Sequence, residues 1–304
     1  MDMLDKFKGV NSINFHKRFT DDDSCLEYLS IIKWKHGYSC KRCGNRNFCQ
    51  GKSKYSRRCT KCKHEESVTA GTMFDKVKFS MLTCFHIIFK ICTKIKGMSA
   101  MEISKEFDTR VMTCWKFKWK VQQAMKSSGH NLLKGEVHVD EFYIGGPEEG
   151  KPGRAAGKKR LVVLALEIIN GKNMGRAYAK VIEDATTVEI LSFMHEHVDK
   201  KANVVADKWA SYISIKESYP LLEQKKSEGG KAFKEFHVHV MNIQGWLRGI
   251  HHHCSKEHLQ GYLDEYHFRF NRRNAMAGTF NALIERMMQA PPIRLENIQK
   301  RSAT

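Results

Sequence analysis

The sequence predicts an α/β protein in which a mixed five-stranded sheet with helices follows a small cysteine-rich module and a helical segment. Three observations support this prediction. Near residue 135 the apolar residues change from helical spacing to the alternation typical of strands. Residues 36–72 are rich in Cys, Lys, Arg and Gly and poor in large apolar groups, so a metal would have to organise them. Residues 78–127 read as three helices.

Composition points to a basic, globular protein. The 304 residues are 41% hydrophobic, enough to bury a full core, and 52 Lys and Arg against 33 Asp and Glu give a net charge of +19. Such a charge favours a nucleic acid as the partner. No run approaches the ~18 apolar residues of a membrane span, and "MDMLDKFKGV" lacks the apolar core of a secretory signal. We therefore expect a cytoplasmic protein with no membrane partner, whose ten cysteines are thiols or metal ligands.

The first segment, "DDDSCLEYLSIIKWKHG", is predicted to be an Asp-capped short helix. After it, the knuckles "CKRC" and "CTKC" are separated by fifteen residues. This spacing can arrange four thiolates tetrahedrally around Zn²⁺ and is typical of a zinc ribbon, with a structural zinc held by the following ligands: Cys40, Cys43, Cys59 and Cys62. From Lys41 to Lys63 there are nine Lys or Arg and no acid. We expect this surface to contact DNA phosphates, with Arg57, Arg58 and Lys61 among the contacts.

The helical segment resembles a helix-turn-helix. "SAMEISKEF" begins at Ser99 with Glu102 three residues on, the pattern of a capping box, and a "DT" turn separates it from "RVMTCWKFKWKVQQAM". If the second helix enters a major groove, its predicted DNA contacts are Arg110, Lys116 and Lys120.

Beyond residue 135, the strand-like runs "GEVHVDEFYIGG", "KRLVVLALEII" and "MGRAYAKVIED" predict three consecutive antiparallel strands. A helix "TTVEILSFMHEHV", a short strand "NVVAD", a possible last strand in "YPLLEQKKS" and two helices follow. Asp140 and Asp207 each end an apolar run. Three strands, a helix and a fourth strand is the order of the RNase H-like fold, in which the first and fourth strands are neighbours. The two carboxylates would then lie side by side and repel unless a cation such as Mg²⁺ joined them.

With these features the chain resembles the bacterial insertion-sequence transposases that have an N-terminal zinc ribbon and an RNase H-like DDE-type catalytic domain. The resemblance extends from about residue 20 to 275. Besides the ribbon, it rests on "TAGTMF" at 69–74, "VDEFYIGG" at 139–146, "ADKWASY" at 206–212 and, above all, "SKEHLQGYLDEYHFRFNRR" at 255–273. It implies a DNA transposase that binds the terminal inverted repeats of an insertion sequence and uses Mg²⁺ or Mn²⁺ at two sites to cleave and join strands. It also implies double-stranded DNA as substrate, a homo-oligomer, and a place at the bacterial nucleoid.

The third metal ligand is the open question of the sequence. In most such enzymes it is a Glu roughly 35 residues beyond the second Asp, but the branch that this chain resembles has Asn or His there. The spacing from Asp207 favours Asn242, with His237 as the alternative, and a site with two protein ligands and water also remains. On a helix His237 and Asn242 lie about 140° apart, so they should not both face one metal. Arg248 corresponds to the basic residue that often follows the third ligand, and Arg272 and Arg273 end the strongest string as further DNA contacts.

The predicted organisation has five segments. They are an N-terminal helical leader (1–35), a zinc ribbon (36–75), a helix-turn-helix-like DNA-binding segment (76–130), an RNase H-like catalytic domain (135–275), and a C-terminal helix and tail (276–304). Two other functions stay open. A catalytically inactive or domesticated DNA-binding regulator would have no use for two strand-end carboxylates. A junction nuclease of the same fold would not need two DNA-binding modules in front.

Overall fold

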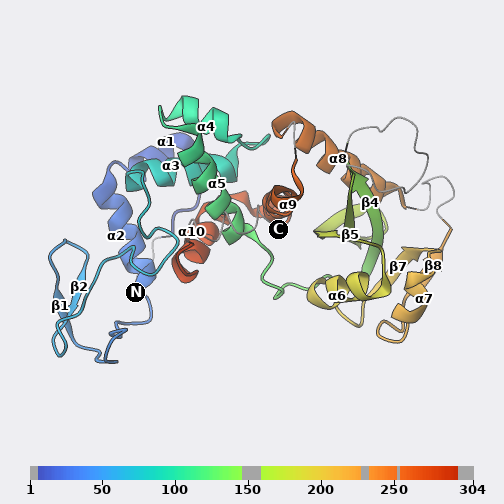
Figure 1. The fold of residues 1–304 in the computed structure, drawn as a ribbon, viewed down its shortest axis with the longest axis horizontal. Helices are drawn as coiled ribbons and strands as arrows, with labels where there is room; N and C mark the ends of the chain where they lie inside the picture. Colours follow the sequence, from blue (N-terminus) through green and yellow to red (C-terminus); the bar gives the residue numbers. More distant parts are fainter. Residues whose placement is uncertain (1–5, 146–158, 227–232, 252–253, 294–304) are drawn as a thin grey trace. The chain divides into compact units, whose positions relative to one another are not determined.

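The computed structural model describes residues 6–145, 159–226, 233–251 and 254–293 (Figure 1). Its contacts divide the chain into two compact units. Unit 1 extends to Met125 and resumes at Asn274, and unit 2 comprises Lys126–Arg273. The last part of the predicted tail, 294–304, lies outside the described residues.

In unit 1 the cysteine-rich module forms a small antiparallel sheet in the order β1-β2-β3, with the strands β1 Phe48–Gln50, β2 Arg57–Cys59 and β3 Glu65–Glu66. Two ion pairs fasten this sheet to helix α2, Asp22–Lys33. Lys33, whose side chain is 8% exposed, binds the buried Glu66 at 2.8 Å, and Lys54 binds Asp23 at 2.6 Å. The buried pair is the stronger restraint, because solvent screens the exposed one.

The helices of unit 1 enclose an aromatic core. They are α1 Ser12–Arg18, α2 Asp22–Lys33, α3 Met81–Thr93, α4 Ala100–Glu106, α5 Val111–Met125 and α10 Thr279–Gln289. Asp21 caps α2 in a full capping box, in agreement with the predicted Asp cap. Phe280 of α10 packs among rings of α1 and α3, and α10 also contacts α2 and α5, so the C-terminal helix is part of unit 1. The sequence did not predict α1.

Unit 2 is built on a mixed sheet in the order β6-β5-β4-β7-β8. Its strands are β4 Glu136–Ile144, β5 Arg160–Ile169, β6 Asn173–Ile182, β7 Asn203–Asp207 and β8 Glu223–Lys225. The first three pair antiparallel, and β7 pairs parallel with both β4 and β8. This is the predicted RNase H-like order, with the first and fourth strands adjacent.

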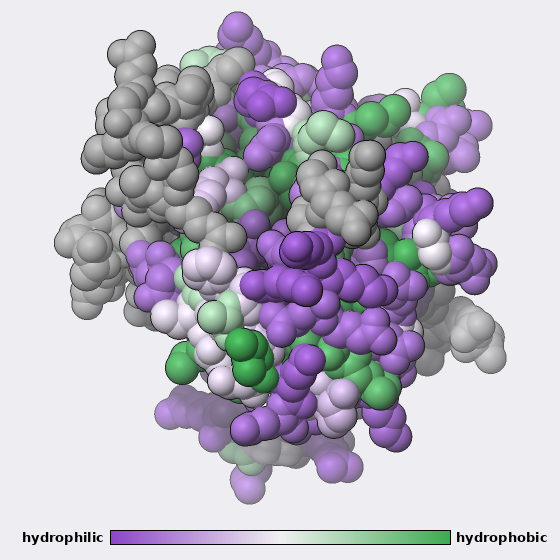
Figure 2. All heavy atoms as spheres, turned by 90° about the vertical axis from the view of Figure 1, so that its right-hand side faces the viewer, coloured by the Kyte–Doolittle hydropathy of each residue, from purple (hydrophilic) through white to green (hydrophobic). Residues whose placement is uncertain are grey.

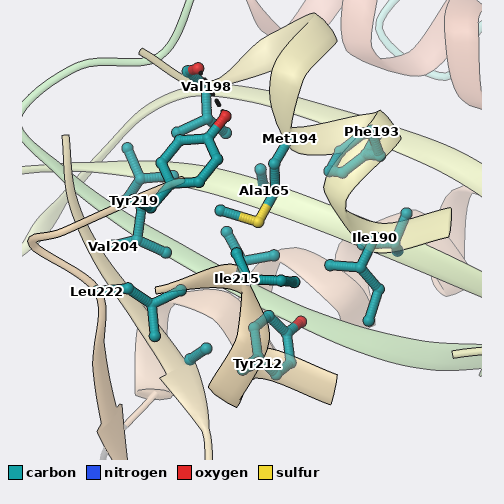
Figure 3. Close-up of a cluster of buried hydrophobic side chains, with 14 of the residues drawn as sticks. Ala165, Ile190, Phe193, Met194, Val198, Val204, Tyr212, Ile215, Tyr219 and Leu222 are labelled. Atoms are coloured by element: carbon teal, nitrogen blue, oxygen red, sulfur yellow. Dashed lines mark hydrogen bonds between the residues drawn. The ribbon is translucent and has the colours of Figure 1, made fainter. Parts of the chain in front are cut away.

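Helices cover both faces of this sheet. On one face α6 Thr187–His197 and α7 Ser211–Ile215 pack over a core that includes Val139 and Ala206. Figure 3 shows Phe193 of α6 and Tyr212 of α7 in this core. On the other face α8 Lys234–Ile250 and α9 Lys256–Phe270 pack over Phe142 and Val205. Because side chains alternate along a strand, the residues next to Val139 and Ala206 in sequence point to the α8 face.

Side chains from α9 and the residues after it close the outer edge of β6. The amide of Gln260 accepts from the N–H of Val181 at 2.9 Å and donates to the Ala179 carbonyl at 3.2 Å. The Asn271 amide bonds both the N–H and the carbonyl of Ala177, at 2.8 and 2.9 Å. The Arg273 guanidinium donates to the Gly175 carbonyl at 3.1 Å and also to the Met174 carbonyl. An edge strand otherwise presents unpaired backbone groups to other chains. The "HLQGYLDEYHFRFNRR" part of the sequence thus has a structural role in protecting this edge.

A buried histidine pair joins α8 to α9. His239 is fully buried and its Nε2 lies 3.3 Å from Nε2 of His267, whose Nδ1 lies 2.8 Å from the Leu263 carbonyl. A carbonyl only accepts, so Nδ1 of His267 carries a proton, and when the ring is neutral its Nε2 accepts from Nε2 of His239. Both histidines can therefore be neutral and hydrogen-bonded to each other.

We expect acid to destabilise unit 2 through this pair. Burial is the main cause that lowers the pKa of His239 to about 2 and that of His267 to about 4. The unfolded chain binds protons on both groups below about pH 6.5 and the folded chain does not, so stability is complete above that pH and falls with acidification. The loss is at most about 1.4 kcal/mol per histidine and pH unit. Burial raises the pKa of Asp264 to about 6, which offsets part of this loss.

Urea unfolding at about pH 7.5 and about pH 5 measures the effect. His267→Asn keeps a donor for the Leu263 carbonyl and should have a flatter pH dependence than the wild type. The exposed His195, replaced by Asn, is the control and should leave the dependence unchanged. Equal wild-type stability at both pH values would contradict the expectation.

Candidate active site

The four predicted zinc ligands come together. Among the residues that the structure describes, Cys40, Cys43, Cys59 and Cys62 form the one group of three or more His, Cys, Asp or Glu whose ligand atoms all lie within 4.8 Å of one another. The Sγ atoms of Cys40 and Cys62 are 3.5 Å apart, and those of Cys43 and Cys59 are 3.6 Å apart. Sulfurs bound tetrahedrally at the usual Zn–S distance would lie about 3.8 Å apart, so the cluster fits a zinc ribbon.

Hydrogen bonds favour the thiolate form of one ligand in this cluster, Cys59. Burial alone would raise the pKa of Cys59, but bonds from the Cys62 backbone and the Asn45 side chain outweigh it and lower the pKa to about 6. The thiolate is the form that binds metal. The side chain of Cys49 lies outside the cluster, is exposed, and contacts the Arg58 carbonyl at 3.6 Å.

The predicted DNA contacts of the ribbon differ in their surroundings. Arg58 and Lys61 are exposed. Arg57 instead stacks between two rings, with its guanidinium carbon 4.3 Å from the centre of Trp34 and 4.0 Å from that of Phe48. Desolvation lowers its pKa. This stacking gives Arg57 a role in packing the ribbon.

The two helices of the predicted helix-turn-helix, α4 and α5, pack against each other. The Ser99 hydroxyl caps α4 by accepting from the N–H of Glu102, but the Glu102 carboxylate pairs with Lys94, so the capping box is only half formed. At the start of α5 Arg110 is exposed, whereas Lys116 and Lys120 are partly buried and desolvation lowers the pKa of Lys120. Arg110 is thus the most accessible of these three cations.

Asp140 and Asp207 are neighbours on one face of the sheet. Val139 pairs with Ala206 in the parallel ladder, and each Asp is the next residue of its strand. Since Val139 and Ala206 point to the core under α6, both carboxylates point to the α8 face. Oδ1 of Asp140 accepts from the N–H of Glu141 at 2.8 Å, and Oδ1 of Asp207 accepts from that of Lys208 at 2.6 Å.

One expectation about Asp140 needs correction. The apolar run suggested that Asp140 ends its strand, but β4 continues to Ile144, and Asp140 pairs with Leu164 of β5. Only the pairing with β7 stops there, because β7 itself ends at Asp207. Asp140 is therefore held in the middle of a strand, where the backbone is better fixed than at a loose strand end.

Helix α8 places His237 and Asn242 differently. The helix buries Phe236 and Val240 against the sheet, and the side chain of His237 is partly buried next to them. Nε2 of His237 is buried and has no hydrogen-bond partner among the described residues. Asn242 is exposed. An unpaired buried nitrogen is costly unless a ligand satisfies it.

The direction of α8 gives the level of each residue along β4. The ring of Phe233 contacts that of His138, and Nε2 of Gln244 donates to the Tyr143 carbonyl at 3.2 Å. Phe233 and Gln244 are eleven residues apart on the helix side, and His138 and Tyr143 are five residues apart on the strand. Both separations correspond to about 16.5 Å, so α8 and β4 run in the same direction over this length. His237 is then level with Asp140, and Asn242 is about two strand residues further on.

The side chains of Asp140, Asp207 and His237 do not form a closed cluster of the kind seen in the ribbon, since their ligand atoms do not all lie within 4.8 Å of one another in the described structure. The donor set nevertheless fits a divalent cation. Two carboxylates supply negative charge and suit Mg²⁺, and an imidazole nitrogen suits Mn²⁺ better.

The sequence did not assign a role to the contact between Glu141 and Tyr212. Glu141 points away from the carboxylate pair, as the strand alternation predicts, and its Oε1 accepts from the Tyr212 hydroxyl at 2.6 Å. Tyr212 is fully buried, and burial, followed by the charges of Glu141, Asp140 and Asp207, raises its pKa well above the ordinary value. Its hydroxyl therefore remains a donor and lies within electrostatic reach of all three carboxylates.

Other predicted cations of unit 2 also differ in exposure. Arg248, near the end of α8, is exposed. Arg273 bonds the β6 edge as described above, and Arg272 lies 3.8 Å over the Phe268 ring and donates to the Phe268 carbonyl at 3.0 Å. These bonds give both arginines structural roles that the sequence did not predict.

The surface of unit 2 on the α7 and β8 side is mostly hydrophilic, with small separate hydrophobic areas, where the view is not covered by grey atoms (Figure 2). In the described part of the chain, no helix is long and apolar enough to cross a membrane. A polar, charged partner suits such a surface better than an apolar one.

Comparison with known proteins supplies the family. No curated protein matches the chain in sequence. Residues 132–271, which include Asp140, Asp207, His237 and Asn242, match the family described as the ISXO2-like transposase domain, so this part of the chain is an insertion-sequence transposase domain, and the resemblance seen in the sequence is confirmed over these residues.

Proposed function

We propose that this protein is a DDE-type DNA transposase that binds the terminal inverted repeats of an insertion sequence and cleaves and joins DNA strands with divalent metal ions. The observation that carries the proposal is that Asp140 and Asp207 each follow the registered pair Val139–Ala206, so both lie on the face of the sheet that α8, with His237, covers. A protein that only binds DNA has no use for two adjacent carboxylates, because they repel each other and the phosphates.

Asp140, Asp207 and His237 would hold the metal ions. Bound Mg²⁺ or Mn²⁺ would activate a water or a 3′-hydroxyl and stabilise the leaving oxygen during in-line attack on phosphorus. The chain's own part is to orient the carboxylates through the N–H groups of Glu141 and Lys208 and to offer the unpaired nitrogen of His237. Arg248, which is exposed on the same helix, would bind a phosphate.

DNA binding would use the exposed cations of unit 1. Arg58 and Lys61 on the zinc-bound ribbon and Arg110 at the start of α5 are the contacts that the exposures favour, with Lys116 and Lys120 less accessible. The partner is double-stranded DNA, both element ends and target, and the active form is a homo-oligomer that pairs two ends.

The test is a strand-joining assay. Purified protein is incubated with DNA that carries the element's end sequence, in Mg²⁺ or Mn²⁺, and the joined products are resolved. End-specific joining supports the proposal. Binding without cleavage in either metal would identify a regulator, and cleavage of branched DNA without end specificity would identify a nuclease.

His237→Ala should reduce joining far more than Asn242→Ala. Loss of an outer partner of a metal ligand costs roughly 10–100-fold, and we expect His237→Ala, as the loss of a ligand itself, to reach at least the upper end of that range. Asn242, exposed on the same helix, is the matched control and should retain most of the activity. Joining rates at saturating DNA, measured in both metals, decide between them. A larger loss in Asn242→Ala would restore the assignment that the sequence spacing favoured.

A further inference from the structure

We propose that Tyr212 and Glu141 are positioning residues that hold the Asp140 and Asp207 carboxylates at the separation needed for metal binding. This inference rests on the proposed function and adds two residues to its site. Neither side chain would touch metal or DNA, because Glu141 points to the opposite face of the sheet and Tyr212 is fully buried.

The need for such a tie arises where β4 and β7 part. The last registered pair of their ladder is Val139 with Ala206. The two aspartates follow this pair, and no later pair of these strands holds them together in the described ladder. Like charges at this fork repel, which favours separation of the strands when no cation is bound.

The bond between Tyr212 and Glu141 spans this fork. Glu141 is the residue after Asp140, and Tyr212 lies five residues after Asp207, on α7. Their bond of 2.6 Å therefore connects the chain beyond one aspartate with the chain beyond the other. A short bond between a phenol and a carboxylate inside the protein is stronger than a neutral one in water.

The segment that carries Tyr212 is itself anchored. The Ser211 hydroxyl donates to the Ala185 carbonyl at 2.7 Å, and the Thr187 hydroxyl donates to the Ser211 carbonyl at 3.0 Å. The residues between Asp207 and Tyr212 are held from β8, where Nε2 of Gln224 donates to the Asp207 carbonyl at 3.2 Å and to the Trp209 carbonyl at 2.9 Å. Movement of Tyr212 relative to Asp207 is thus restrained, and the bond transmits this restraint to β4.

Tyr212→Phe removes the hydroxyl and keeps the ring in its core. We expect the Mn²⁺ or Mg²⁺ concentration for half-maximal joining to rise about tenfold, as when an outer partner of a metal ligand is lost. Mn²⁺ binding, followed by electron paramagnetic resonance with Asp140→Asn as the baseline, should weaken by a similar factor without any need for DNA or turnover.

Glu141→Gln keeps an acceptor oxygen and should stay close to the wild type, whereas Glu141→Leu should match Tyr212→Phe. The double variant that combines Glu141→Leu with Tyr212→Phe should be no worse than either single one, since both remove the same bond.

Tyr219→Phe is the matched control. Tyr219 is also fully buried in the same core, and its hydroxyl donates to the Val198 carbonyl at 3.2 Å (Figure 3). Its loss should lower thermal stability to a degree similar to that of Tyr212→Phe but leave the metal dependence unchanged. Equal metal dependence in Tyr212→Phe and the wild type, or an equal shift in both Tyr variants, would overturn this inference and leave the proposed function intact. Wild-type protein that neither binds Mn²⁺ above the Asp140→Asn baseline nor joins DNA would overturn both.

Discussion

Asp140→Asn should reduce strand cleavage and joining by about a thousandfold or more, while the protein still folds and binds DNA. Metal stabilisation of the charge that develops on phosphorus is worth several kcal/mol, and each ~1.4 kcal/mol is a factor of ten in rate. Asn has the shape of Asp and can still accept from the N–H of Glu141, so the strand should be undisturbed. What the variant loses is one of the two negative charges that attract the cations.

The measurement needs three readouts on the same preparation: end binding by gel shift, joining in Mg²⁺ and Mn²⁺, and the melting temperature. Asp184→Asn is the control for charge, because Asp184 is exposed in the turn between β6 and α6. It should leave all three readouts unchanged. If Asp140→Asn joined DNA as fast as the wild type in both metals, the carboxylate pair would have no catalytic role.

The sheet and its carboxylate pair could be predicted because their signals are local. Alternation in β4, β5 and β6 and the short apolar run of β7 identify the strands, and their order makes the first and fourth neighbours. The prediction that Asp140 and Asp207 lie side by side follows from that strand order alone. The short helices α1 and α7 were missed, because seven and five residues carry too little periodicity to predict a helix.

The choice between His237 and Asn242 could not be made from the sequence. Counting residues beyond Asp207 ignores the loop that leads to α8, and the rotation of that helix depends on which side chains it buries. Burial of Phe236 and Val240 sets this rotation, and it leaves His237 partly buried and Asn242 exposed. The count favours Asn242, whereas the proposed role of His237 rests on this burial.

Contacts between residues far apart in the chain could not be predicted either, because they depend on how the elements pack. Tyr212 and Glu141 are 71 residues apart, and nothing in their own neighbourhoods indicates the bond. Basic residues present the reverse problem, because a formal charge does not tell whether a guanidinium faces solvent. Arg273 and Arg57 were predicted to contact DNA, yet one bonds the backbone of β6 and the other stacks between rings. Sequence identifies a charge, and only packing shows whether it is available.

Removal of zinc should unfold the ribbon and weaken binding to element ends by about tenfold or more, because the module carries nine Lys or Arg between Lys41 and Lys63. Its own buried hydrophobic cluster is small, comprising Tyr38, Cys40 and Cys59 with Trp34 and Cys62 packed against it. Zinc bound by four thiolates contributes about 10–16 kcal/mol in small modules, far more than such a core can. The Lys33–Glu66 pair would persist only if the strand that holds Glu66 stayed folded.

Chelation, followed by gel shift and limited proteolysis, measures this effect, and Cys43→Ser should reproduce it without a chelator. Cys49→Ser is the matched control, since Cys49 is likewise exposed in the ribbon but lies outside the cluster. We expect new cleavage within residues 36–75 in the first variant and none in the second. Unchanged end binding after complete zinc loss would contradict a role of the ribbon in recognition. It would favour Arg110 and helix α5 instead, because that helix needs no metal to stay folded.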